Sequence, residues 1–86
     1  SEPRVTALRR LLRICEITAE WDRAVDLCGE LLRIGTDTVT PGQLAHYYCE
    51  LAEEARKKSD WKEAYRLLEQ AEAVEPGKVR CTIIRG

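Results

Sequence analysis

The sequence has few of the features that mark membrane spans or nucleic-acid-binding surfaces. Its 86 residues contain no long apolar run, and 34% of them are charged, so direct membrane insertion is not expected. Fourteen basic residues nearly balance 15 acidic ones, whereas a nucleic-acid-binding face needs a clustered basic excess. No low-complexity segment is present. The length fits one small domain, in which about two-thirds of the unfolded surface becomes buried.

The usual cysteine pattern of a metal site is also absent. The four cysteines are separated by 13, 21 and 32 residues, and no two of them form a C-x-x-C pair. This spacing disfavours a zinc knuckle. Cys28 lies on an apolar stripe, where a free cysteine behaves as a small hydrophobic residue. We therefore expect buried, reduced thiols in a reducing compartment, with no metal and no cofactor.

The dominant positive signal is a pair of amphipathic stripes between residues 44 and 76. The polar run 56–60 separates the two stripes, and Pro76 closes the unit because proline cannot continue a helix. The stripes consist of Leu44, Tyr48, Leu51, Ala52 and Ala55, followed by Trp61, Ala64, Tyr65, Leu68 and Ala71. Residues 21–24 parallel residues 61–64 at an offset of 40, which indicates an upstream copy.

Start and stop signals predict four helices and the beginning of a fifth. The expected ranges are 3–18, 21–34, 41–58, 60–74 and a fifth helix from about residue 78. Thr40 is a candidate N-cap that forms a capping box with Gln43, and Gly35 is a candidate left-handed stop. The β-branched residues 82–84 are the closest approach to a strand pattern.

This spacing resembles the tetratricopeptide repeat, a helix–turn–helix unit of 34 residues. With Ala45 as position 1, the large residue at position 4 is Tyr48, the small residue at position 8 is Ala52, and the proline at position 32 is Pro76. With Val5 as position 1, the upstream copy has Leu12 where a small residue is usual. We therefore expect the first hairpin to pack less closely than the second.

The resemblance implies an all-α fragment of a right-handed α-solenoid, with residues 1–86 forming one repeat domain. Repeat one would cover about residues 5–38, repeat two about 39–78, and residues 79–86 would begin a third. We expect the chain to be a piece of a longer solenoid, because it ends partway through a repeat. Self-association through the open repeat ends is a further expectation.

In the tetratricopeptide family, the first helix of each repeat faces a concave groove that holds partner segments. The resemblance therefore implies a groove for a protein or peptide segment, lined by Arg9, Arg13, Glu16, His46, Cys49, Glu53, Arg56 and Lys57. The alternative is a solvated face on which Arg13 and Glu53 partly neutralise each other. Arg13 and Glu50 stand where chaperone-tail clamps have asparagines, which argues against that mode of carboxylate binding.

His46 and Cys49 lie three residues apart and form the most distinctive reactive pair. They could be a metal pair or a thiol–imidazole dyad, or simply a polar pair lining the groove. A catalytic dyad needs an orienting partner and a pocket, and the sequence shows neither. We therefore expect no enzymatic activity from this chain.

A narrower resemblance is to a bacterial family of lipopolysaccharide assembly proteins, carried by the runs EWDRAVDLCGELLRIGTD, LAHYYCELAEEA and AYRLLEQAEAVEPGKVR. It implies a cytoplasmic repeat scaffold, tethered to the inner membrane by an N-terminal helix and followed by a rubredoxin-like metal knuckle. Neither feature is in these residues. The family helps set lipopolysaccharide levels, working with a membrane-bound protease that degrades the deacetylase committing lipid A synthesis. The alternative is the repeat segment of a larger enzyme, such as an N-acetylglucosaminyltransferase.

Overall fold

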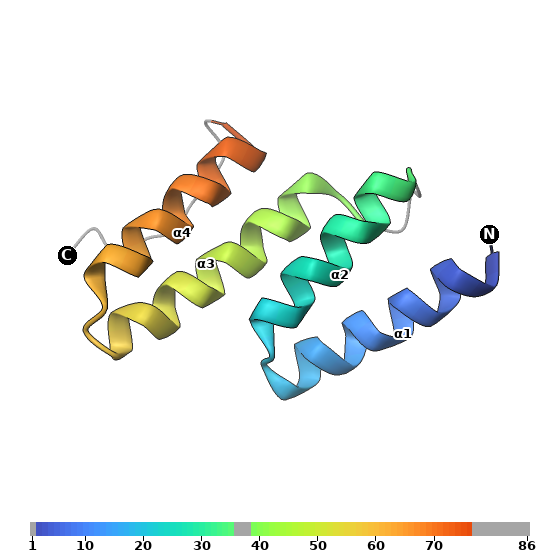
Figure 1. The fold of residues 1–86 in the computed structure, drawn as a ribbon, viewed down its shortest axis with the longest axis horizontal. Coiled ribbons are helices and arrows are strands. Elements are labelled where there is room, and N and C mark those ends of the chain that lie inside the picture. Colours follow the sequence, from blue (N-terminus) through green and yellow to red (C-terminus); the bar gives the residue numbers. More distant parts are fainter. Residues whose placement is uncertain (1, 36–38, 77–86) are drawn as a thin grey trace.

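The computed structural model describes residues 2–35 and 39–76. This part of the chain forms four α-helices and no strand: α1 (Glu2–Thr18), α2 (Trp21–Ile34), α3 (Pro41–Lys57) and α4 (Trp61–Val74) (Figure 1). The all-α, helical-hairpin fold class predicted from the sequence is confirmed, and each helix bound lies within one residue of its prediction or at it. The expected fifth helix, the β-branched run 82–84 and the third repeat lie outside the described residues, and the repeat boundaries remain a prediction.

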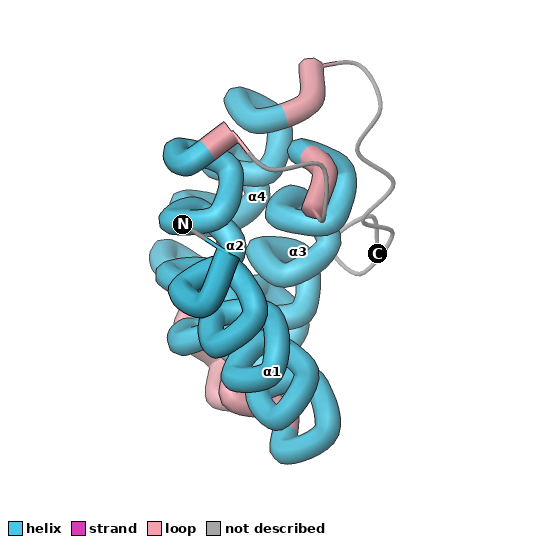
Figure 2. The backbone as a smooth tube through the Cα atoms, turned by 90° about the vertical axis from the view of Figure 1, so that its right-hand side faces the viewer, coloured by secondary structure: helices cyan, strands magenta, loops and turns pink. Residues whose placement is uncertain are grey.

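The helices pack in chain order. Within the described residues, α1 packs on α2, α2 on α3 and α3 on α4, with no further pairing of helices. Figure 1 shows the two hairpins side by side, and Figure 2 shows the same stack with α1 nearest the viewer. An arrangement in which each element contacts only its neighbours is characteristic of repeat proteins.

Both hairpin turns have the same backbone geometry, 40 residues apart. Ala19 has a φ of 60° and Ser59 a φ of 62°, so each turn contains a left-handed residue that is not glycine. In the first turn the amide of Glu20 donates to the carbonyl of Cys15 at 2.9 Å, and the equivalent bond of the second turn measures 2.8 Å. This 6→1 bond around a left-handed residue is the Schellman C-cap, which reverses the chain within a few residues.

The predicted helix caps form, with one difference. The Thr40 hydroxyl accepts from the amide of Gln43 at 3.2 Å, and the Asp60 carboxylate accepts from the amide three residues on at 3.3 Å. Gly35 ends α2 with a φ of 88°. The capping box predicted at Thr40 is only half made, because the Gln43 side chain bonds the Tyr47 hydroxyl instead of returning to the cap.

Two separate groups of buried side chains hold the helices together. The first, contributed by α1, α2, α3 and the segment before α3, consists of Leu12, Cys15, Ala24, Cys28, Leu31, Val39 and Tyr47. The second, between α3 and α4, consists of Ala52, Ala55, Ala64 and Leu67. We call them the first and second cores. Val39, which lies between the ranges expected for the second and third helices, is buried in the first core at 5% exposure.

The first hairpin packs less closely than the second, as the sequence predicted. The backbones of α3 and α4 approach each other over a greater length than those of α1 and α2. Leu12 in α1 stands where α3 has Ala52, and both side chains are buried. A leucine between two helices keeps their axes further apart than an alanine does.

The buried stripes of α3 and α4 are rotated relative to the prediction. Tyr47 is the buried tyrosine at 1% exposure, whereas Tyr48, which the sequence placed on the apolar stripe, packs at the edge of the second core. Leu67, rather than Leu68, is the fully buried leucine of α4. For α3 the rotation follows from its contact with α2 on one side and α4 on the other.

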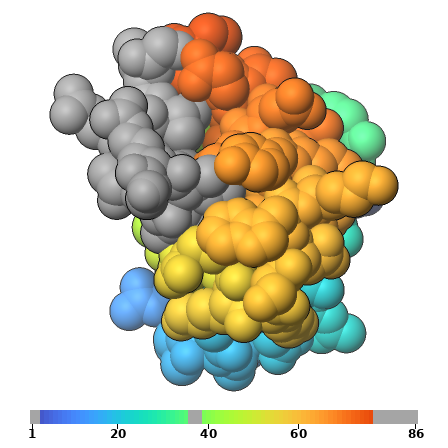
Figure 3. All heavy atoms as spheres, turned by 90° about the vertical axis from the view of Figure 1, so that its left-hand side faces the viewer, coloured from blue at the N-terminus to red at the C-terminus, as the bar shows by residue number. Residues whose placement is uncertain are grey.

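Trp61 and Tyr65, which the sequence placed on the apolar stripe of α4, are 47% and 56% exposed. Among the described elements α4 has only one neighbour, so one stripe suffices to bury it. The space-filling view in Figure 3 shows α4 spread across the outer surface of the molecule. The predicted interior role of these two rings is therefore wrong for the described residues.

Candidate protein-binding surface

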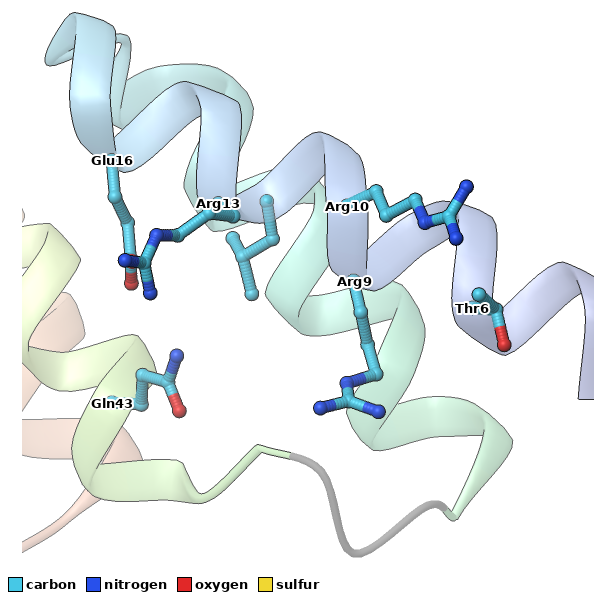
Figure 4. A pocket seen from close by; sticks show the side chains of 7 residues that line it. Thr6, Arg9, Arg10, Arg13, Glu16 and Gln43 are labelled. Atoms are coloured by element: carbon cyan, nitrogen blue, oxygen red, sulfur yellow. The ribbon is translucent and has the colours of Figure 1, made fainter.

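The structure divides the predicted groove into two parts. Three of its residues, Arg9, Arg13 and Glu16, line a hollow of about 450 Å³ between α1 and the first turn of α3. The full lining is Thr6, Arg9, Arg10, Leu12, Arg13, Glu16 and Gln43, shown in Figure 4. We call it the arginine hollow. The other five predicted residues lie further along α3 and do not line it.

His46 and Cys49 do not form a reactive pair. The His46 imidazole lies 3.5 Å from the Glu50 carboxylate, and its ring meets Trp21 edge-on at a centroid distance of 6.2 Å. The described part of the chain contains no group of three or more histidine, cysteine, aspartate or glutamate residues that could hold a metal ion.

Glu53 is paired within its own helix rather than with α1. Its carboxylate accepts from the Arg56 guanidinium at 2.6 Å, a hydrogen bond that lowers the pKa of Glu53. No ion pair joins Arg13 and Glu53 in the described chain, and the solvated-face alternative stays a prediction. Lys57 is exposed at the last turn of α3.

The arginines of the hollow differ from the others in the described chain. Five arginines form ion pairs with glutamates, namely Arg4, Arg23, Arg33, Arg56 and Arg66. Over residues 2–35 and 39–76, no ion pair involves Arg9, Arg10 or Arg13. The unpaired arginines of the described chain thus all lie on one helix, around one concavity.

A short hydrogen-bond chain through the buried Tyr47 links Gln43 and Glu16, two residues that line the hollow. The Gln43 amide donates to the Tyr47 hydroxyl at 2.7 Å, and that hydroxyl donates to the Glu16 carboxylate. Burial raises the pKa of Tyr47, and the bond to Glu16 raises it further. Trp21 stacks on the Tyr47 ring at a centroid distance of 5.9 Å and fixes its orientation.

Sequence reasoning missed four residues that line the hollow: Thr6, Arg10, Leu12 and Gln43. Three lie on α1, among the predicted arginines, and the run Arg9-Arg10 followed by Arg13 was a visible signal. Gln43 had been interpreted only as part of a helix cap. Its position depends on how α3 meets α1, which helical periodicity does not specify.

The remaining described thiols are buried and unreactive. Burial raises the pKa of Cys28 to about 11, with the charge of Glu16 as the second cause, and burial also raises the pKa of Cys15. Both are free cysteines and remain protonated at neutral pH. Neither has the lowered pKa of a catalytic nucleophile.

Two helical hairpins with matching turns and an arginine-lined concavity define the class: an all-α helical-repeat protein, consistent with a tetratricopeptide-type fragment. None of the four described helices combines the length and apolarity needed to cross a bilayer. No family model matches the chain. No solved structure matches it either.

The sequence is similar to lipopolysaccharide assembly protein B of Escherichia coli strain K12, with 35% identity over 83 residues. The proteins of the same name in Escherichia coli O6:H1 and O157:H7 match equally well. The match covers 96% of this chain and 21% of the relative, so the chain spans about a fifth of the length of the curated relatives it matches. The resemblance inferred from the sequence is thereby confirmed.

Proposed function

We propose that this chain is a segment of a non-catalytic scaffold that acts in lipopolysaccharide assembly. The observation that carries the proposal is the 35% identity to lipopolysaccharide assembly protein B across 96% of the chain. A helical-repeat fold supports it, since such folds offer extended surfaces for other proteins. In this proposal the scaffold lies at the cytoplasmic face of the inner membrane, and parts of the protein outside these residues tether it.

The proposed contact surface for a protein segment is the side of the molecule formed by α1 and α3. It comprises Arg9, Arg13, Glu16, His46, Cys49, Glu53, Arg56 and Lys57. The arginine hollow supports its α1 half, because it combines concavity with uncompensated charge. In the α3 half, Glu53 forms an ion pair with Arg56, and the His46 imidazole lies 3.5 Å from the Glu50 carboxylate. We therefore propose that α1 recognises the charge of the partner segment and that α3 contributes shape complementarity to it.

A chimera tests the role in lipopolysaccharide assembly. The 83 matched residues of the E. coli K12 protein are replaced by the matching residues of this chain, in a strain lacking its own copy. We expect the chimera to restore cellular lipopolysaccharide to the level given by the unaltered protein. A second chimera carrying Ala24→Glu is the control, because Ala24 is fully buried and a charge there prevents packing.

The proposal fails if the first chimera is present at normal levels in the cell and still leaves lipopolysaccharide as it is in the strain without the protein. Restoration by both chimeras would also contradict it, because function would then not depend on the folded hairpins.

A further inference from the structure

We propose that the arginine hollow docks an extended acidic protein segment, with Arg9 and Arg13 each receiving a carboxylate. This inference rests on the scaffold function proposed above and names the chemistry of the partner. It begins from charge: Arg9, Arg10 and Arg13 carry three guanidinium groups to one hollow, and none is neutralised by a carboxylate of the described chain. Guanidinium groups bind carboxylates through paired hydrogen bonds.

The positive charge of the arginine hollow differs in sign from the net charge of the whole chain. The chain has a net charge of −1, so it has no general attraction for anions. A partner that recognises the hollow must therefore bring its negative charge to α1 itself. Charge complementarity of this kind steers encounter and selects partners.

The spacing of the arginines matches a peptide better than a single compact anion. Arg9 and Arg13 are four residues apart on one helix, which places them about 6 Å apart along the helix axis. Alternate side chains of an extended strand are about 6.6 Å apart. In Figure 4, Arg13 extends towards Glu16 and Gln43, whereas the guanidinium group of Arg9 lies well apart from it. Two separate carboxylates suit this arrangement.

Glu16 acts as a positioning residue in this proposal. It is the one acidic residue lining the hollow and lies three positions from Arg13, close enough for a pair within the helix. Its carboxylate instead accepts the hydroxyl of the buried Tyr47. That bond directs the carboxylate towards α3 and leaves Arg13 available to an incoming segment.

The test uses the full 86-residue chain and two fluorescein-labelled octapeptides, one alternating Glu and Ala and one alternating Gln and Ala. Fluorescence anisotropy measures binding at low and at high salt. We expect the Glu peptide to bind and the Gln peptide not to bind. The double variant Arg9→Gln/Arg13→Gln should lose about tenfold or more in affinity, and rising salt should weaken the wild-type interaction.

The matched control is Arg23→Gln/Arg66→Gln, which removes the same charge from arginines that are paired elsewhere and exposed. We expect it to bind the Glu peptide within about twofold of the wild-type chain. Glu16→Gln should bind the Glu peptide more tightly, because it removes a repelling charge and retains an acceptor for Tyr47. Circular dichroism confirms that each variant is folded.

Equal losses in the two double variants would overturn the proposal, as would equal binding of both peptides or no binding of the Glu peptide. Anionic phosphatidylglycerol vesicles and inorganic phosphate are tested in parallel, and their binding in place of the Glu peptide would also overturn it. Peptide binding combined with a failed chimera would refute the lipopolysaccharide role alone. If the chimera restores lipopolysaccharide but the 86-residue chain does not bind the Glu peptide, only the assignment of the arginine hollow is refuted.

Discussion

The hydroxyl of Tyr47 on α3 donates a hydrogen bond to the carboxylate of Glu16 on α1. These helices do not pack against each other, since α2 separates their backbones. Over the described part of the chain this is the one hydrogen bond that connects them. It links the interior of the first core to the wall of the arginine hollow.

We expect Tyr47→Phe to lower the free energy of unfolding by about 1.5–3 kcal/mol, the usual contribution of a hydrogen bond to a charged group. The ring and its packing against Trp21 are retained, so the loss reports the hydroxyl. Urea unfolding followed by circular dichroism measures it. Tyr48→Phe is the control, because the Tyr48 hydroxyl makes no hydrogen bond with the described residues. Equal effects of the two substitutions would contradict the assignment.

Glycine at either hairpin turn should stabilise the protein. Ala19 and Ser59 both adopt a left-handed backbone, which costs a residue with a Cβ atom about 1–2 kcal/mol. Glycine also has a greater conformational entropy in the unfolded chain, which offsets part of this gain. The free energy of unfolding should therefore rise by about 0.5–1 kcal/mol in Ala19→Gly and in Ser59→Gly.

The control for the turns is Ala7→Gly, an exposed position inside α1, which should lose about 1 kcal/mol. Thermal unfolding of the three variants compares them directly. A loss of stability in either turn variant would show that the left-handed geometry at that turn is not the one described.

The loss of stability caused by a core substitution should follow the observed burial of the residue rather than its position in the repeat. Leu31 is fully buried, so Leu31→Ala should cost about 2–5 kcal/mol. Leu67→Ala should cost more than Leu68→Ala, because Leu67 is 4% exposed and Leu68 lies at the edge of the second core. Ala64→Leu should cost about 1–3 kcal/mol through overpacking. Denaturant midpoints test this ranking, and a larger effect at Leu68 would contradict it.

Cys15 and Cys28 should resist alkylation in the folded protein. Both are buried, and burial raises the pKa of each thiol above its ordinary value, to about 11 for Cys28. At neutral pH we expect no labelling by iodoacetamide until guanidinium is added, with mass spectrometry of tryptic peptides as the readout. Rapid labelling of Cys28 in the native protein would contradict its burial.

Stability should fall with acid partly through Glu30. Hydrogen bonds from Arg33 and Arg4 lower the pKa of Glu30 below its ordinary value of 4.5. The unfolded chain therefore binds more protons near that pH, and the stabilisation is present above the unfolded pKa and lost as pH falls through the folded pKa. The melting temperature of Glu30→Gln should depend less on pH between about 6 and about 3 than that of the wild-type chain.

Glu69→Gln is the control for the pH experiment, because Glu69 is exposed and makes no ion pair with the described residues. Its melting profile should follow the wild-type profile. High salt should reduce the difference between Glu30→Gln and the wild-type chain, since the ion pairs involved are partly exposed.

The helices could be predicted closely because their signals are local. The Thr40 cap, the Gly35 stop and the polar turns each act over a few residues. The exact buried face could not be predicted in the same way. An apolar stripe fixes the orientation of a helix only to within about one residue, and the positions of its neighbours decide between Tyr47 and Tyr48.

The candidate site was predictable only on α1, where Arg9 and Arg13 share one helix face. The contact of Glu16 with Tyr47 joins residues 31 positions apart, and no periodic signal connects them. Residue spacing describes neighbours along the chain, whereas this contact depends on how the three helices are placed in space.

The two cores share no residue, and this separation shapes how cooperatively the molecule unfolds. Loss of α4 exposes the alanine-lined second core, while all seven buried members of the first core retain their partners. Loss of α3 is different, because α3 supplies Tyr47 to one core and Ala52 and Ala55 to the other. The third helix is therefore the coupling element, and without it the protein becomes two independent helical pieces.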